Sequence, residues 1–180
     1  SGFIGQGAKV QEFETNLSNQ FKQTTSNVLT FNSATSAEHL AYHLLKTPGT
    51  FNIPYEYGSI PTQWPGIQQG DEVLTTALTC TATNWPILAN GMKLRWVDID
   101  PTTLNICLKD LESKLSENTK IVTVVHWGGY PVDLVELENI RIRFKQRYGF
   151  SFMILDDSAH AFGSKLDGKL IGTFDTITTF

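Results

Sequence analysis

The stretch FMILDDSAHAFG, residues 152–163, places two adjacent acids directly after an apolar run. The run from Phe152 to Leu155 predicts a short buried strand, because segments of this kind form the interior strands of parallel sheets. Carboxylates are costly to bury unless they are paired or hydrogen-bonded. We therefore expect Asp156 and Asp157 to mark a place where polar partners gather at the end of a strand.

Strands and helices alternate through the chain before this stretch. The sequence predicts further strands over residues 71–77, 94–99 and 121–125. It predicts helices between them over residues 82–89, 108–115 and 132–147. Helices at these intervals produce β–α–β units, so the expected fold class is α/β, a three-layer sandwich whose mainly parallel sheet is covered on both faces. In such sheets, ligands bind at the carboxyl ends of the strands.

The first 70 residues have a less regular pattern. Apolar residues at helical spacing predict an amphipathic helix over residues 6–21, and residues 27–31 are predicted to form a short strand. A second helix is predicted over residues 37–46. Its inward side is expected to consist of Leu40, Leu44 and Leu45. Residues 47–70 are rich in proline and glycine, and we predict a long loop or insertion there.

The composition excludes several classes of function. The chain has 180 residues, 41% hydrophobic and 18% charged, which is typical of one soluble globular domain. A formal net charge of −4 without a basic run argues against a nucleic-acid partner, and no apolar run is long enough to cross a membrane. With no secretory signal visible, we expect a cytoplasmic protein in which Cys80 and Cys107 are free thiols.

Two further motifs are incomplete, and no metal site is predicted. His39 and His43 have the spacing of a zinc-protease helix, but Leu40 stands where that motif requires glutamate, so both histidines are expected to be partly exposed. Residues 163–170 nearly match a phosphate-binding P-loop, but Leu170 replaces the Ser/Thr that binds Mg²⁺. A glycine-containing hairpin turn is the better prediction for that segment.

Small residues follow the predicted strand at 27–31. Residues 32–36 open the next helix, where free N–H groups and the hydroxyls of Thr35 and Ser36 suit a phosphate. An ordinary Ser/Thr cap explains the same residues. The sequence leaves both interpretations open.

The acids at 156 and 157 also allow two interpretations. A carboxylate at this strand end can hold the ring nitrogen of a cofactor protonated, and His160 could reach the same ligand. An aspartate that caps the next helix, followed by a surface histidine, fits the spacing equally well. The turn at residues 126–131, which follows another predicted strand, is either a pocket wall or a well-packed turn.

Seven segments, taken in order, resemble the DegT/DnrJ/StrS family of sugar aminotransferases that depend on pyridoxal 5′-phosphate (PLP). The segments are residues 5–14, 32–40, 70–74, 79–84, 97–105, 126–133 and 156–163. The resemblance covers most of the chain. It implies that the chain is part of the large domain of PLP-dependent fold type I.

The resemblance also implies roles for individual residues. Thr35 and Ser36 match the positions that bind the cofactor phosphate, and Asp157 matches the carboxylate that pairs with the pyridine nitrogen. His160 matches a Gln or His near the phenolic oxygen of the ring. Cys80 stands where most members stack Phe or Trp on the ring face, and a thiol cannot supply aromatic stacking.

The Schiff-base lysine of the family is expected after Phe180, beyond a strand that resembles residues 172–180. Lys165 and Lys169 lie in the predicted hairpin turn and are not candidates. Residues 1–180 are therefore interpreted as a fragment that contains part of the large domain and lacks the small C-terminal domain. We expect this fragment to be inactive alone.

Three functions follow from the resemblance. The first is a parent aminotransferase that acts on a nucleotide-linked keto-sugar with glutamate as the expected amino donor. The second is a sugar dehydratase of the same family, in which His replaces the lysine. The third, for the isolated chain, is a non-catalytic module that binds phosphate or associates with a partner. Family members form dimers, so a homodimer is expected.

Overall fold

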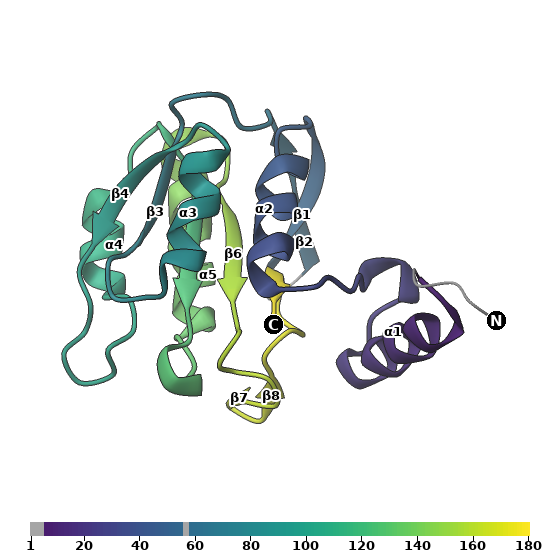
Figure 1. Ribbon diagram of the computed structural model, residues 1–180. Helices are drawn as coiled ribbons and strands as arrows, with labels where there is room; N and C mark the ends of the chain where they lie inside the picture. The colour runs from purple at the N-terminus through teal and green to yellow at the C-terminus, as the bar shows by residue number, and fades with distance from the viewer. Residues whose placement is uncertain (1–5, 56–57) are drawn as a thin grey trace.

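The computed structural model describes residues 6–55 and 58–180, and its centre is a parallel sheet (Figure 1). The strands of this sheet are β3 (Glu72–Thr76), β4 (Lys93–Val97), β5 (Thr119–Val125), β6 (Met153–Asp157) and β9 (Ile177–Thr179). They lie in the order β4–β3–β5–β6–β9, and every neighbouring pair is parallel. The strands predicted from residue 71 onward are confirmed.

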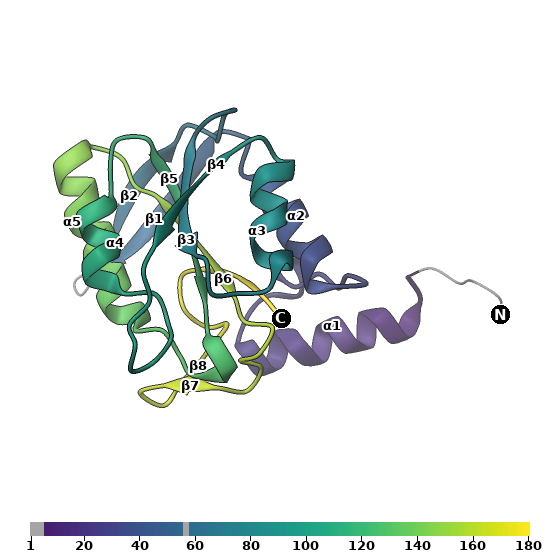
Figure 2. The same cartoon turned by 60° about the vertical axis from the view of Figure 1, so that its left-hand side comes forward.

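Helices cover both faces of the sheet (Figure 2). One face carries α2 (Ala34–Leu44) and α3 (Thr81–Ala89), and the other carries α4 (Leu108–Lys114) and α5 (Leu134–Tyr148). The predicted α/β sandwich of three layers is confirmed. Among the described residues, none of the helices combines the length and the apolar character that a bilayer crossing requires.

Consecutive residues of the central strands pack into opposite cores. Val122 and Ile154 belong to the cluster that includes the buried residues of α5, whereas Ile121 and Leu155 belong to the cluster beneath α2 and α3. Because successive side chains of a strand alternate between faces, a strand buried on both sides reads as an unbroken apolar run. The same alternation directs Asp156 and Asp157 to opposite faces.

Helix α1 (Ala8–Phe21) lies beside the three layers and confirms the helix predicted over residues 6–21 (Figure 1). The strand predicted over residues 27–31 is wrong. A 3-10 turn occupies Thr25–Asn27, and the residues after it pair with no strand in the described part of the chain. The backbone N–H of Thr30 instead donates to the Glu14 carboxylate of α1 at 3.0 Å. The Glu14 side chain thus accepts the backbone hydrogen bond that a neighbouring strand would otherwise accept.

Helix α2 begins earlier than predicted, because Ser33 caps it by accepting a hydrogen bond from the Ser36 N–H at 3.2 Å. The expected inward side is also partly wrong. Leu45 is buried, Leu40 is half-buried, and Leu44 is 57% exposed. The buried stripe at helical spacing consists of Glu38, Ala41, Tyr42 and Leu45.

The loop predicted over residues 47–70 is wrong for most of its length. Strands β1 (Gly49–Tyr55) and β2 (Gly58–Trp64) pair antiparallel in a sheet of their own. Proline is tolerated on edge strands, and both strands of a two-stranded sheet are edges, so the prolines at 54 and 61 do not prevent pairing. The indole N–H of Trp64 donates to the Leu45 carbonyl at 2.8 Å and ties the hairpin to the end of α2.

The hairpin turn predicted over residues 163–170 is confirmed. Strands β7 (Lys165–Leu166) and β8 (Lys169–Leu170) pair antiparallel, and no helix follows the glycines as a P-loop requires. The loop that leads into this hairpin packs against the short 3-10 turn η2 (Trp127–Gly129) after β5. Ser164 Oγ donates to the carbonyl of Gly129 at 2.8 Å, which joins the two strand-end loops.

Gly129 is expected to be required for this junction. It has a φ of +82°, and an added Cβ would lie 2.7 Å from the His160 carbonyl oxygen. Gly128 is a matched control, because its φ is +61° and an added Cβ meets nothing within 4 Å. Gly129→Ala should lower the free energy of unfolding in urea by about 2 kcal/mol more than Gly128→Ala. Equal losses would show that the loops tolerate separation.

Candidate functional site

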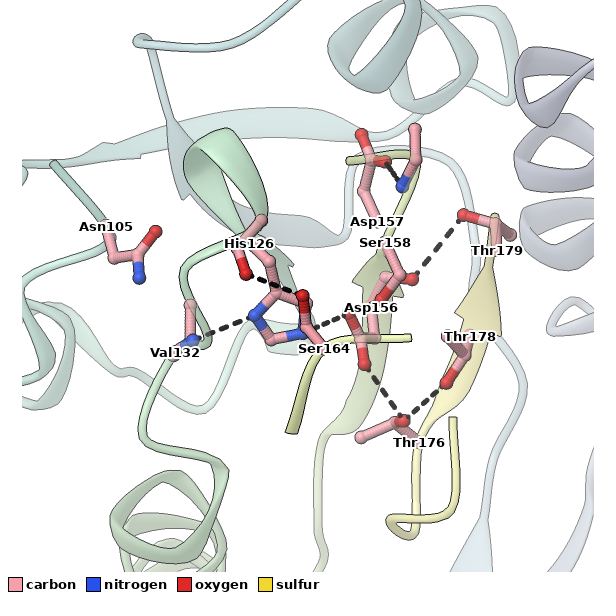
Figure 3. Close-up of polar contacts among 12 residues, drawn as sticks. Asn105, His126, Val132, Asp156, Asp157, Ser158, Ser164, Thr176, Thr178 and Thr179 are labelled. Carbon is pink, nitrogen blue, oxygen red and sulfur yellow. Dashed lines mark hydrogen bonds and ion pairs between the residues drawn. The ribbon is translucent and has the colours of Figure 1, made fainter. Parts of the chain in front are cut away.

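The two aspartates at the end of β6 form the centre of the candidate site (Figure 3). Asp156 is fully buried, and Asp157 is 7% exposed. They lie at the carboxyl end of a parallel strand, beside β5 on one side and β9 on the other. This is the edge at which sheets of this kind bind ligands.

Asp156 is surrounded by donors from three loops (Figure 3). His126 Nε2 lies 2.8 Å from Asp156 Oδ1, and Ser158 Oγ donates to the same oxygen at 2.8 Å. Thr176 Oγ1 lies 3.5 Å from Asp156 Oδ2. Because His126 Nδ1 accepts a hydrogen bond from the Val132 N–H at 2.8 Å, the ring proton belongs on Nε2, facing Asp156. Asp156 therefore serves to fasten the strand ends together.

The turn after β5 is held by hydrogen bonds to Asn105, and the pocket wall and the well-packed turn both stay predictions. The Trp127 N–H donates to Asn105 Oδ1 at 2.9 Å, and Asn105 Nδ2 donates to the Tyr130 carbonyl at 2.9 Å. His126 is fully buried beneath it. The sequence pattern located this turn but did not identify the pairing of His126 with Asp156.

Asp157 faces α2 and α3 on the other side of the sheet. The Thr83 hydroxyl of α3 donates to Asp157 Oδ2 at 2.6 Å, and the Ala159 N–H donates to Asp157 Oδ1 at 3.1 Å. Thr83 is held in turn by the hydroxyl of Thr79 at 2.8 Å. Both oxygens of the Asp157 carboxylate therefore accept a hydrogen bond, which holds the group in one orientation.

Glu38 of α2 is an acidic neighbour of Asp157. It is 1% exposed, and Thr179 Oγ1 of β9 donates to its Oε1 over a long 3.5 Å. Its Oε2 is buried without a hydrogen-bond partner of favourable geometry among the described residues. Burial, followed by the charge of Asp157 and a hydrogen bond with it, raises the pKa of Glu38 to about 9. Glu38 is therefore a neutral acid at pH 7.

Four of the five predicted site residues come from the start of α2, the start of α3 and the end of β6. Thr35 and Ser36 form the first turn of α2, one helical turn before Glu38, and Asp157 lies close enough to Glu38 to raise its pKa. Cys80 occupies the N-cap position of α3, is exposed, and is near enough to Glu38 to act on its charge.

His160 is not shown to join this group. It is exposed, and its ring packs edge-on against Trp127 with 6.3 Å between ring centres. On the outer side of α2, the side chains of Thr35 and Ser36 line a shallow depression together with His39, His43 and Trp85. Both helix histidines are exposed, as predicted.

The arrangement suits a ligand with a basic ring nitrogen and a phosphate. Asp157 offers one anionic carboxylate at the strand end, with no lysine or arginine bonded to it in the described residues. Ser33 meets the capping requirement of α2, and the first N–H groups of a helix have no partner inside the helix. The N–H groups and the Thr35 hydroxyl are thus suited to an anion. Within the described ranges, no cluster of three or more His, Cys, Asp or Glu is arranged for a metal ion.

Sequence reasoning missed Glu38, Thr83 and Thr179. Glu38 left a detectable signal, because residues 38, 41, 42 and 45 have the spacing of one helix face. Thr83 and Thr179 left none, since their role depends on which elements the fold brings to the end of β6.

Known proteins share the sequence and the fold. A sequence model of the DegT/DnrJ/EryC1/StrS aminotransferase family matches residues 59–180. The GDP-4-keto-6-deoxy-D-mannose 3-dehydratase of Yersinia pseudotuberculosis is 35% identical over 119 residues, which cover 66% of this chain and 29% of that protein.

Two solved structures have a similar backbone. The sugar aminotransferase CalS13 from Micromonospora echinospora is 40% identical with a TM-score of 0.73, over 90% of this chain and 38% of that one. A GDP-4-keto-6-deoxymannose-3-dehydratase with a trapped PLP–glutamate geminal diamine is 25% identical with a TM-score of 0.75, over 93% of this chain and 38% of that one. The chain thus spans well under half the length of the proteins it matches.

The buried acid pair has a measurable consequence for stability. The folded-state pKa of Glu38 is raised from 4.5 to about 9, so the stability that its protonated form contributes is complete below pH 4.5 and is lost as the pH rises toward 9. Glu38→Gln cannot ionise, so its advantage over the natural chain should grow by about 1 kcal/mol per pH unit across that window. Urea unfolding from pH 5 to 8.5 measures this slope.

The exposed Glu117, which lies before the opposite end of β5, provides the control for this measurement. Glu117→Gln should show no such slope. A pH-independent difference for Glu38→Gln would mean that Glu38 is ionised in the folded chain.

Proposed function

The chain belongs to the DegT/DnrJ/EryC1/StrS aminotransferase family, and from this membership we propose that the whole protein is a PLP-dependent aminotransferase acting on a nucleotide-linked keto-sugar. The 40% identity to the sugar aminotransferase CalS13 supports the reaction class. The GDP-linked sugar in the name of the Yersinia relative supports a nucleotide-linked substrate. The PLP–glutamate species in the dehydratase structure supports the cofactor and glutamate as amino donor.

The observation that carries the proposal is the Asp157 carboxylate, 7% exposed and held by two donors at the strand end. When bound, PLP supplies an electron sink whose strength depends on a protonated ring nitrogen. Asp157 keeps the proton on that nitrogen by charge pairing. Thr83 and the Ala159 N–H hold the carboxylate in one orientation, so Asp157 is preorganised for this contact.

The other predicted residues complete the cofactor half-site. Thr35 and Ser36, with the first N–H groups of α2, bind the phosphate, and the helix dipole favours its negative charge. Cys80 lies at the ring face, where its polarizable sulfur replaces an aromatic ring. His160, whose exposed ring packs against Trp127, is proposed to be the residue near the phenolic oxygen of the ring.

The 180 residues alone are proposed not to turn over. Lys165 and Lys169 are exposed in the β7–β8 hairpin, and the Lys169 ammonium lies 4.2 Å above the ring of Phe174. Neither is bonded to Asp157 or Glu38 in the described part of the chain. The lysine that carries the cofactor is proposed to lie in a segment outside these residues. Residues 1–180 then supply cofactor binding, with no group to move protons at the substrate carbon.

A sugar dehydratase of the same family is the second candidate, and the 35% identity to the Yersinia dehydratase favours it. The two activities differ in their products, because transamination adds nitrogen to the sugar whereas dehydration removes a hydroxyl group as water. Incubation of the whole protein with a GDP- or dTDP-linked 4-keto-sugar and glutamate, followed by mass measurement of the product, distinguishes them.

We further propose that the whole protein is a cytoplasmic homodimer. Cys80 and Cys107 are free thiols, which suits a reducing compartment. Large apolar side chains along α1, the segment after it and α2 are exposed in the single chain, as a self-associating surface requires. They include Phe13, Leu29, Phe31 and Leu44.

Replacement of Asp157 by alanine in the whole protein is expected to weaken PLP binding about a hundredfold, because the ring cation loses a buried partner. Titration of the apoprotein, followed by the absorbance of bound cofactor, measures the change. Glu117→Ala, at the opposite end of the sheet, should bind PLP as the natural protein does. A loss of less than threefold for Asp157→Ala would exclude Asp157 as the partner of the ring nitrogen.

Borohydride reduction of the isolated chain in the presence of PLP should leave no lysine stoichiometrically labelled. Peptide mass mapping detects the label, and the whole protein treated in the same way serves as the positive control with one labelled lysine. Stoichiometric labelling of Lys165 or Lys169 in the isolated chain would contradict the proposal that the lysine lies elsewhere.

A further inference from the structure

Glu38 is a buried carboxyl group that none of the proposed cofactor contacts uses. It occupies the second turn of α2 and is 1% exposed, on a stripe otherwise made of Ala41, Tyr42 and Leu45. An acid in such a position is costly unless it is paired or neutral. Glu38 is on the side of the sheet that Asp157 faces, and Asp157 is the neighbouring charge with the largest effect on it.

The groups around Glu38 include no cation among the described residues. From β6 it faces Asp157, from α3 it faces Cys80, and from β9 it faces the neutral hydroxyl of Thr179. On its own helix, Tyr42 follows one turn later, and its hydroxyl is already bonded to Thr123 at 2.6 Å. Two neighbouring carboxyl groups without a cation between them retain one proton.

The hydrogen bonds decide which of the two acids holds that proton. Asp157 accepts from the Thr83 hydroxyl at 2.6 Å and from the Ala159 N–H at 3.1 Å, so both of its oxygens already have donors. Glu38 has only the 3.5 Å contact from Thr179, and its Oε2 is buried without a donor to it in the described ranges. A proton on Glu38 that is donated to Asp157 satisfies both groups.

We propose that Glu38 is a positioning residue for the cofactor: as a neutral acid, it donates a hydrogen bond to Asp157 and fixes both the orientation and the single negative charge of that carboxylate. Asp157 then has a third donor in addition to Thr83 and Ala159. Three donors hold a carboxylate in one orientation, so its contact with a ring nitrogen is preorganised. The inference rests on the proposed contact between Asp157 and the ring nitrogen.

The first test needs no cofactor. Infrared spectra of the apoprotein at pH 7 should contain the C=O stretch of a protonated carboxylic acid, and Glu38→Gln should remove it. Asp157→Asn should retain the band but shift it, because the hydrogen-bond acceptor of Glu38 has changed from a carboxylate to an amide. A spectrum without the band, or a band that Asp157→Asn leaves unmoved, overturns the proposal.

The second test uses PLP and the whole protein. Glu38→Gln keeps an N–H donor for Asp157 and should bind PLP within about threefold of the natural protein, whereas Glu38→Leu has no donor and should bind about tenfold more weakly, as expected for one lost hydrogen bond to a charged group. Circular dichroism establishes that both variants fold. Equal affinities for the Leu and Gln variants overturn the positioning role.

The two tests separate this inference from the proposed function. If the natural protein does not bind PLP, the proposed function fails while the infrared result still reports the acid pair. If PLP binds and Asp157→Ala abolishes binding but the infrared band is absent, the proposed function stands and the role of Glu38 is wrong. If Glu38→Leu does not fold, the infrared comparison of Glu38→Gln with Asp157→Asn still decides.

Discussion

Two carboxylates on consecutive residues at the end of a buried strand impose the constraint on which the rest of the site depends. Because strand residues alternate between faces, Asp156 and Asp157 cannot share partners, and each face of the sheet has to compensate its own charge. The α5 side does so with His126, Ser158 and Thr176, which come from loops. The α2 side does so with groups from α3, from the backbone and from Glu38.

The two solutions have different consequences. On the α5 side, Asp156 is fully buried and its contacts join the ends of β5, β6 and β9. Both of its oxygens have partners within the protein, so its role is to hold the edge of the sheet. On the α2 side, the donors to Asp157 come from α3 and from the backbone, and the group remains 7% exposed. One acid holds the strand ends together, and the other stays partly exposed at the same edge of the sheet.

The sheet and its helices could be predicted from the sequence because each depends on local patterns. The apolar runs at β5 and β6 have neighbours on both faces, so they read as strands without knowledge of the partners. The hairpin β1–β2 could not be predicted in this way: its prolines are unfavourable in central strands, and only a two-stranded sheet makes both strands edges. The strand predicted over residues 27–31 is wrong for the opposite reason. Their composition favours a strand, but no partner strand lies beside them in the described part of the chain.

The site residues also divide into those that the sequence could locate and those that it could not. Asp157, Thr35 and Ser36 stand at the ends of elements that the sequence predicts. Thr83 and Thr179 acquire their roles only when the fold brings α3 and β9 beside β6.

Glu38 was only partly predictable. The spacing of its neighbours indicates a buried helix face, but an acid on that face is not expected to be buried. Holding a proton at pH 7 on a group whose ordinary pKa is 4.5 disfavours folding by about 3 kcal/mol, a large share of the stability of a domain of this size. A leucine on the same stripe would fill the space with no such penalty. A residue that lowers stability within an otherwise apolar stripe, near the carboxylate at the strand end, is expected where selection for function opposes selection for stability. The unfavourable protonation of Glu38 is thus itself an argument that the charge on Asp157 has to be single, oriented and held in advance of the ligand.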